Sequence, residues 1–193
     1  MRILVTGFEP FGGEPINSSL EVVRNLPRSV GGARVSTAAL PVVYRRSLAV
    51  LRRLVALEKP DAVLCLGLAG GRKALSFETR AVNLDDARIP DNDGHQPGGE
   101  EIRRGGPAEL PPTLPLRRIA RELRRASIPF EFSPSAGTFL CNHVFYGLVD
   151  YIHREDPSIL GGFVHVPHIR EHLATDLEEL VRGIRAAIRT LDS

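Results

Sequence analysis

A cysteine at the start of a predicted helix is the residue of this chain whose position most favours chemistry. Cys141 follows the small residues of 135–138 and stands just before the helical pattern of 143–154. In the first turn of a helix, the macrodipole and unpaired backbone N–H groups both favour the thiolate, the form that attacks carbonyl carbons. Free cysteines are also often small buried hydrophobes, so position alone leaves a structural role open.

Two distant residues could complete a site around such a thiolate. His165 lies at the end of a predicted buried strand, 163–166, and next to a thiolate its imidazole would serve as general base and acid. A hydrogen-bonded core histidine is the structural alternative. Glu78 follows a glycine-rich loop and could orient a histidine, as the third member of a triad does. An ion pair of Glu78 with Arg72 or Arg80 is the competing interpretation.

Metal and nucleic-acid motifs are weaker. His165, His168 and His172 are closely spaced, but no H-E-x-x-H is present and Pro167 interrupts the segment, so we predict no metal. Residues 91–94 resemble the start of a calcium loop that lacks the acid an EF-hand needs at its twelfth position, which favours a turn. The arginines of 117–125 have apolar neighbours and no aromatic platform, which favours a solvated helix face over RNA binding.

The elements that must position these residues alternate along the chain. Short apolar runs predict strands at 3–6, 34–39, 62–66 and 163–166, with weaker candidates at 75–83 and 130–132. Helical periodicity covers 18–26, 43–57, 116–126, 143–154 and 175–191. Continuous apolar strands separated by helices predict an α/β fold, with a mainly parallel sheet covered on both faces. We expect one domain over 1–193.

Two irregular segments interrupt this alternation. The loop 7–17 follows the first strand and contains Phe8, Phe11 and several glycines, but it matches neither phosphate-binding fingerprint. Its aromatic rings could wall an apolar ligand or simply pack beneath the loop. The segment 85–115 is long, polar and rich in proline and glycine, and long loops inside a compact domain are often functional.

Composition narrows the class of protein. The chain has 25 Lys+Arg against 23 Asp+Glu, a net charge of +2, which is too balanced to predict a nucleic-acid or membrane partner. Two cysteines make no disulfide framework, and Cys65 falls in an apolar run that predicts a buried strand. The apolar stretch at the N-terminus is too short for a signal peptide, and none approaches the roughly 20 residues that span a bilayer. We expect a cytoplasmic protein.

Four blocks, in order, resemble the pyroglutamyl peptidase I family of cysteine peptidases, which remove an N-terminal pyroglutamyl residue. These blocks, together with the opening loop 6–13, extend the resemblance over essentially the whole chain: Gly67–Arg72, Asp86–Asn92, Ser135–Gly147 and His165–Pro167. The resemblance implies a three-layer α/β/α sandwich, no cofactor, a cytoplasmic location and a homo-oligomer, dimer or tetramer. The implied partners are small peptides with N-terminal pyroglutamate.

By the same resemblance, Cys141 is the nucleophile, His165 its base and Glu78 the orienting acid. Phe8 and Phe11 match residues that sandwich the lactam ring. The other implied substrate-binding residues are the apolar Ile89, Phe139 and Leu140 and the polar Asn17 and Arg88, with Arg88 near the developing oxyanion.

The chain departs from the family pattern at three places. Arg80 is shifted by one position after the acid, residues 18–20 lack the usual Pro-Ser-Trp, and Leu68 replaces a glutamine of some relatives. The last two differences concern the edge of the pocket. Two alternatives stay open: another amide hydrolase with a Cys-His-Glu site, and a binding protein of the same fold that holds a pyroglutamyl ligand without cleaving it.

Overall fold

A seven-stranded sheet forms the centre of the molecule, as a computed structural model describes it for residues 1–169 and 174–191. The strands follow the order β10-β5-β11-β4-β1-β3-β2. Their bounds are β1 Arg2–Phe8, β2 Ser29–Val30, β3 Ala33–Leu40, β4 Ala62–Leu68, β5 Leu75–Glu78, β10 Phe130–Ser133 and β11 Leu160–Val166. Neighbours are parallel except at β5/β11 and β2/β3. The expected α/β class with a mainly parallel sheet is therefore confirmed.

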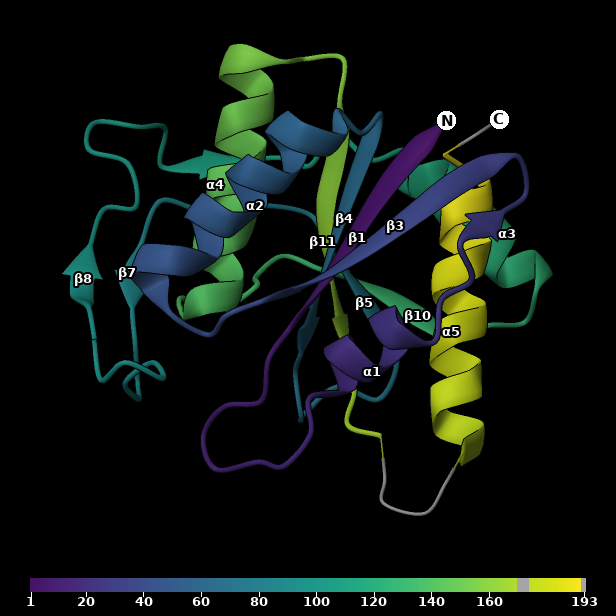
Figure 1. The fold of residues 1–193 in the computed structure, drawn as a ribbon, viewed down its shortest axis with the longest axis horizontal. Helices are drawn as coiled ribbons and strands as arrows, with labels where there is room; N and C mark the ends of the chain where they lie inside the picture. The colour runs from purple at the N-terminus through teal and green to yellow at the C-terminus, as the bar shows by residue number, and fades with distance from the viewer. Residues whose placement is uncertain (170–173, 192–193) are drawn as a thin grey trace.

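Helices cover both faces of this sheet (Figure 1). The helices are α1 Ser18–Arg24, α2 Tyr44–Glu58, α3 Leu116–Arg125, α4 Leu140–Glu155 and α5 Ala174–Arg189. Helices α2 and α4 enclose one apolar core against the sheet, whereas α1, α3 and α5 enclose the other. The result is the three-layer α/β/α sandwich that the family resemblance implies. Among the described helices, none is long and apolar enough to cross a membrane.

The weaker strand candidate at 75–83 divides into two elements. Strand β5 ends at Glu78, and β6 (Ala81–Val82) leaves the large sheet to pair with β9 (Glu109–Leu110). A second small sheet joins β7 (Asp85–Asp86) to β8 (Gly98–Glu100). The long segment 85–115 therefore contains short strands of its own, and the two small sheets pack against α4.

Candidate active site

Three neighbouring strands carry the centre of the site on one face of the sheet. Glu78 ends β5, His165 lies near the end of β11, and Gly67 is directly beside His165 on β4. Strands β5 and β11 pair with Ser76 opposite His165, so Glu78 is the diagonal neighbour of the histidine on the same face. The antiparallel direction of β5 thus brings the carboxyl group to the imidazole.

The carboxyl and the imidazole form a buried hydrogen-bonded pair. His165 Nδ1 lies 2.8 Å from Glu78 Oε1, and the Glu78 side chain is completely buried. Burial alone would lower the pKa of His165. The charge of the Cys141 sulfur and its hydrogen bond to the ring, followed by Glu78, outweigh burial and raise this pKa to about 9. The imidazole therefore has the cysteine on one side and the glutamate on the other.

Helix α4 places Cys141 over β4 at Gly67, the position that has no side chain. The helix begins at Leu140 with Phe139 as its N-cap, so Cys141 occupies the first turn, as expected. A Cβ atom built on Gly67 would lie only 2.8 Å from Cys141 Sγ, which shows how closely the sulfur lies above that glycine. Cys141 is partly exposed, whereas Cys65 is buried and burial raises its thiol pKa to about 12. Only the first of these thiols is available to a substrate.

A narrow apolar pocket opens beside Cys141. Its walls come from the end of β1, the loop 7–17, the segment between β3 and α2, the end of β4 and the start of α4: Phe8, Phe11, Asn17, Val42, Leu68, Phe139, Leu140 and Cys141. The ring centroids of Phe11 and Phe139 lie 6.0 Å apart. The cavity volume is about 10 Å³, room for roughly one water molecule. The enclosed space is thus smaller than a five-membered ring, and the rest of the pocket is open to solvent.

Asn17 lines this pocket but already has partners within the protein. Its side-chain oxygen accepts hydrogen bonds from the N–H and hydroxyl of Ser19, which makes it the N-cap of α1. Its amide nitrogen donates to the carbonyl of Glu9 at 3.1 Å. Because an amide NH₂ has two protons, one remains for a ligand. The residue holds the loop 7–17 in place, a structural role that the sequence did not suggest.

Two of the expected substrate-binding residues lie outside the pocket walls. Arg88 and Ile89 are exposed on the loop after β7, with Ile89 43% exposed. This loop still adjoins the site, because the N–H of Asp86 donates to the carbonyl of Thr138, three residues before Cys141. It also meets the loop 7–17, where the side chain of Asn92 donates to the carbonyl of Pro10. The two irregular segments of the sequence therefore meet at one end of the pocket.

The competing interpretation of Glu78 also has a basis in the structure. Arg72 Nη2 lies 3.7 Å from Glu78 Oε1, in addition to the histidine. Arg80 points elsewhere and pairs with Glu109 at 2.8 Å. The shifted arginine of this chain therefore has its ion pair away from the site.

The remaining motifs have structural settings. Asp91 accepts backbone hydrogen bonds from Asp93 and His95 and forms the expected turn. Among the described residues, no group of three or more His, Cys, Asp or Glu side chains could hold a metal; His172 lies outside those residues. The arginines of α3 lie around a helix whose buried side is Ile119, Ala120 and Leu123.

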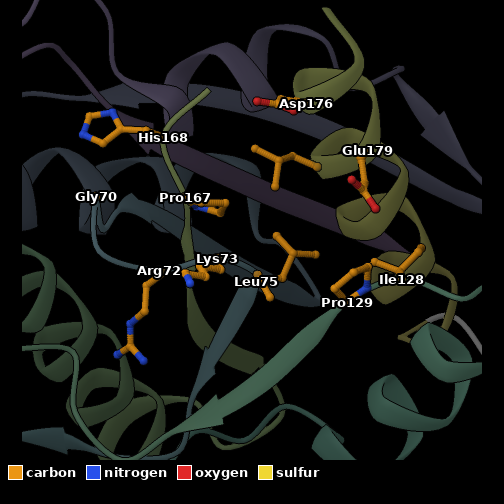
Figure 2. A pocket seen from close by; sticks show the side chains of 12 residues that line it. Gly70, Arg72, Lys73, Leu75, Ile128, Pro129, Pro167, His168, Asp176 and Glu179 are labelled. Carbon is orange, nitrogen blue, oxygen red and sulfur yellow. The ribbon is translucent and has the colours of Figure 1, made fainter. Parts of the chain in front are cut away.

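A second, wider cavity lies elsewhere. It has a volume of about 430 Å³ and lies on the α5 side of the sheet, between the start of β5 and the first turns of α5. In Figure 2, the guanidinium of Arg72 points away from Asp176 and Glu179, the acidic residues of the opposite wall. Cys141 is not in its lining, whereas the apolar pocket described above includes Cys141.

Sequence reasoning missed two features of the site. Val42 lines the pocket just before α2, whereas Leu68, the departure expected at the edge of the pocket, does lie in its lining. The sequence marks Gly67 as part of a motif, but it does not indicate that the missing side chain leaves room for the Cys141 sulfur. Its position in a buried strand was the available signal, because glycine there often marks a close approach of another group.

Comparison with known proteins identifies the family. A family model described as pyroglutamyl peptidase matches residues 1–192. The pyrrolidone-carboxylate peptidase of Bacillus amyloliquefaciens is 48% identical over 98% of this chain and 91% of its own length. That of Thermosipho africanus is 40% identical over 99% of this chain and 97% of its own.

Solved structures agree with this assignment. The crystal structure of pyroglutamyl peptidase I from Bacillus amyloliquefaciens has a TM-score of 0.92 and 44% identity, covering 98% of this chain and 93% of that one. The pyrrolidone carboxyl peptidase from Thermococcus litoralis has a TM-score of 0.92 and 36% identity, covering 98% and 92%. The chain described here, with a partly exposed cysteine beside a buried histidine–glutamate pair, belongs to the pyroglutamyl peptidase family.

Proposed function

We propose that the protein removes N-terminal pyroglutamate from small peptides by cysteine catalysis, without a cofactor. The observation that carries this proposal is the line Glu78–His165–Cys141 beside an apolar pocket, in a chain of the pyroglutamyl peptidase family. Cys141 is the nucleophile, His165 the acid and base, and Glu78 the group that orients the imidazole.

In the first step the Cys141 thiolate attacks the pyroglutamyl carbonyl carbon. A C–S bond forms, and the carbonyl π electrons move to the oxygen. When the tetrahedral intermediate collapses, the C–N bond breaks and the His165 imidazolium gives its proton to the leaving amine. The peptide departs with a free amino terminus, and pyroglutamate remains as a thioester on the sulfur.

Water completes the reaction in the second step. Neutral His165 takes a proton from water as the oxygen attacks the thioester carbon, and the C–S bond breaks when that intermediate collapses. Free pyroglutamate leaves, and the thiolate–imidazolium pair is restored. Glu78 supports both steps, because its hydrogen bond to Nδ1 fixes the tautomer and leaves Nε2 to face the sulfur.

The oxyanion of each intermediate needs hydrogen-bond donors close to the sulfur. The first backbone N–H groups of α4 have no acceptor within the helix. They lie at the N-terminal end of α4, the same end as Cys141. Arg88 is the candidate for an additional cationic donor, from the exposed loop that meets Thr138.

The lining of the pocket favours a neutral ring. Pyroglutamate has no free amine, so a carboxylate anchor would gain nothing, whereas the flat faces of Phe11 and Phe139 suit a lactam. The remaining N–H of the Asn17 amide is available to the ring carbonyl. Ile89, Leu140 and Phe8 complete the apolar side in this proposal.

The test compares turnover of a pyroglutamyl amide bearing a chromogenic amine. Cys141→Ala is expected to abolish amine release, while Cys65→Ala, a matched change at the buried thiol, retains it. Unchanged release by Cys141→Ala would end the assignment. Equal turnover of amides with free amino termini would favour a different amide hydrolase. Tight calorimetric binding of pyroglutamate without any turnover by the wild type would favour a binding protein.

The setting of the protein belongs to the same proposal. A reduced catalytic thiol suits the cytoplasm. The family resemblance favours a homodimer or homotetramer, which analytical ultracentrifugation would distinguish from a monomer.

A further inference from the structure

Arg72 lies at the junction of the triad acid and the neighbouring strand β10. Its Nη1 is 2.7 Å from Glu131 Oε1, and its Nη2 donates to Ser133 Oγ at 2.7 Å. The same Nη2 is 3.7 Å from Glu78 Oε1. One guanidinium therefore connects an anion at the edge of the sheet with the anion that holds His165.

Glu78 depends on a small number of partners. Its Oε1 faces both His165 and Arg72, and its Oε2 is buried with no hydrogen-bond partner among the described residues. A carboxylate that is fully buried is costly unless nearby positive charge or donors compensate it. Since Arg80 pairs with Glu109, Arg72 is the one arginine in the described ion pairs that reaches Glu78.

The opposite side of Arg72 is fixed by its surroundings. Glu131 also accepts a hydrogen bond from Ser76 at 2.6 Å, so the anion that holds the guanidinium is itself anchored on β5. Arg72 further contacts the carbonyl of Ser135, in the segment that leads to the helix of Cys141. The Arg72 side chain is 30% exposed, so solvent screens only part of its charge.

We propose that Arg72 is a positioning residue of the triad: its charge compensates the buried Glu78 carboxylate and aims it at His165, while Glu131 holds the guanidinium in place. The inference rests on the proposed function, because it assigns Arg72 a role through Glu78. The notable feature is that Glu131 and Glu78 compete for one cation, so substitutions at the two ends should act with opposite sign.

The sign follows from charge alone. Removing a nearby positive charge makes every neighbouring group hold its proton more tightly. In Arg72→Gln, both limbs of the pH profile of kcat/KM should therefore move to higher pH, by about half a unit or more, with kcat/KM reduced about tenfold. Glu131→Gln removes the competing anion, so both limbs should move to lower pH.

The experiment measures pH profiles of kcat/KM for a pyroglutamyl amide in wild type, Arg72→Gln, Arg72→Lys and Glu131→Gln. Arg72→Lys keeps the charge and is expected to keep the limbs of the wild type with lower turnover. Millimolar guanidinium should partly restore the profile of Arg72→Gln. If Arg72→Gln does not fold, the downward shift of Glu131→Gln, a substitution of a half-exposed side chain, decides the question.

Several results would overturn the proposal. A purely structural role of the bridge predicts that Arg72→Gln and Glu131→Gln both lose activity with unmoved limbs, or with limbs that move in the same direction. The pH profile of Cys141 alkylation by iodoacetamide gives the same comparison without turnover. If Cys141→Ala stays active, the proposed function fails; if it is inactive and the limbs do not move, only the role of Arg72 fails.

Discussion

At Gly67, the absence of a side chain allows a sulfur atom to lie beside an imidazole over the sheet. The residue pairs with His165 in the β4/β11 ladder, so any side chain at this position would share the face on which the histidine points. A Cβ there would meet Cys141 Sγ at 2.8 Å and the ring of Phe163 at 2.7 Å. The position of the sulfur thus depends on the absence of a side chain at Gly67 of the neighbouring strand β4.

Gly67→Ala is expected to displace the Cys141 sulfur, the proposed nucleophile. Because a misplacement of about 1 Å can cost about 100-fold in rate, we expect kcat of the variant to fall by about that factor. Gly71→Ala is the matched control, since a Cβ there meets nothing within 4 Å. Turnover of both variants is compared after circular dichroism has confirmed folding. Equal activity of Gly67→Ala and wild type would contradict the close approach.

The raised pKa of His165 makes a prediction about pH. With this pKa at about 9, the imidazolium persists through neutral pH and is lost as the pH rises through about 9. We expect kcat/KM to fall over that range, because the leaving amine then has no proton donor. His165→Ala should move the pH profile of Cys141 alkylation to higher pH, because the sulfur then has no imidazolium partner. An alkylation profile unchanged by this substitution would count against the ion pair.

At the scale of elements, the loop that contains Asp91 caps the N-terminus of α2. Val43 at the N-cap of α2 provides no side-chain hydrogen bond, and Asp91 supplies one instead by accepting from the N–H of Tyr44 at 2.9 Å. Tyr44 in turn packs edge-on against Phe139, with ring centroids 5.7 Å apart. The turn that resembled a calcium loop therefore supports a wall of the pocket.

Asp91→Ala should lower the free energy of unfolding by about 1–2 kcal/mol, the usual cost of a lost cap. Burial alone would raise the pKa of Asp91, but the N–H groups of Tyr44, His95 and Asp93 outweigh it and hold the pKa below its usual range. The stabilisation is present above the unfolded value of about 3.9 and is lost as pH falls through the lower folded value.

Urea unfolding at pH 7 and at pH 3 measures this effect. Asp93→Ala is the control, because Asp93 makes an exposed ion pair with Arg46 at 3.2 Å and should change stability by less than about 0.5 kcal/mol. A difference between Asp91→Ala and wild type that grows as the pH falls would have the wrong sign for this account.

At the scale of the molecule, local and non-local features differed in how far the sequence predicted them. The strands, the helices and the place of Cys141 in a first turn follow from local patterns, and the structure agrees with them. The pairing of Glu78 with His165 depends on β5 lying antiparallel beside β11, and strand order leaves no trace in hydrophobic periodicity. Of the sequence evidence, only the family resemblance predicts that Glu78 and His165 belong to one site.

The positions of the long loops were the least predictable part. Arg88 and Ile89 were expected at the pocket, but they lie exposed on a loop whose place is set by distant hydrogen bonds, such as that of Asn92 to Pro10. The choice of Arg72 over Arg80 as the partner of Glu78 is equally non-local, because it depends on β10. Side-chain geometry, and not residue type, decides both.

The narrow pocket predicts that binding and loop movement are coupled. Since the enclosed part of the pocket, about 10 Å³, is smaller than a lactam, we expect pyroglutamate to bind with a displacement of Phe11 and its loop. Hydrogen exchange of 7–17 should change when the ligand saturates the protein, and ligand at 100 times Kd should stabilise folding by about 2.7 kcal/mol. At the same ligand concentration, Phe11→Ala should weaken both effects, because its Kd rises, whereas the exposed control Leu57→Ala should not. No change in exchange at saturation would contradict the coupling.

The most direct test of the central claim is to trap the acyl-enzyme. The wild type and Cys65→Ala are mixed with a pyroglutamyl ester, quenched in acid, digested and analysed by mass spectrometry. We expect a pyroglutamyl thioester on the peptide that contains Cys141 in both proteins, and no such adduct in Cys141→Ala. Turnover that proceeds with the adduct on another residue would contradict this expectation.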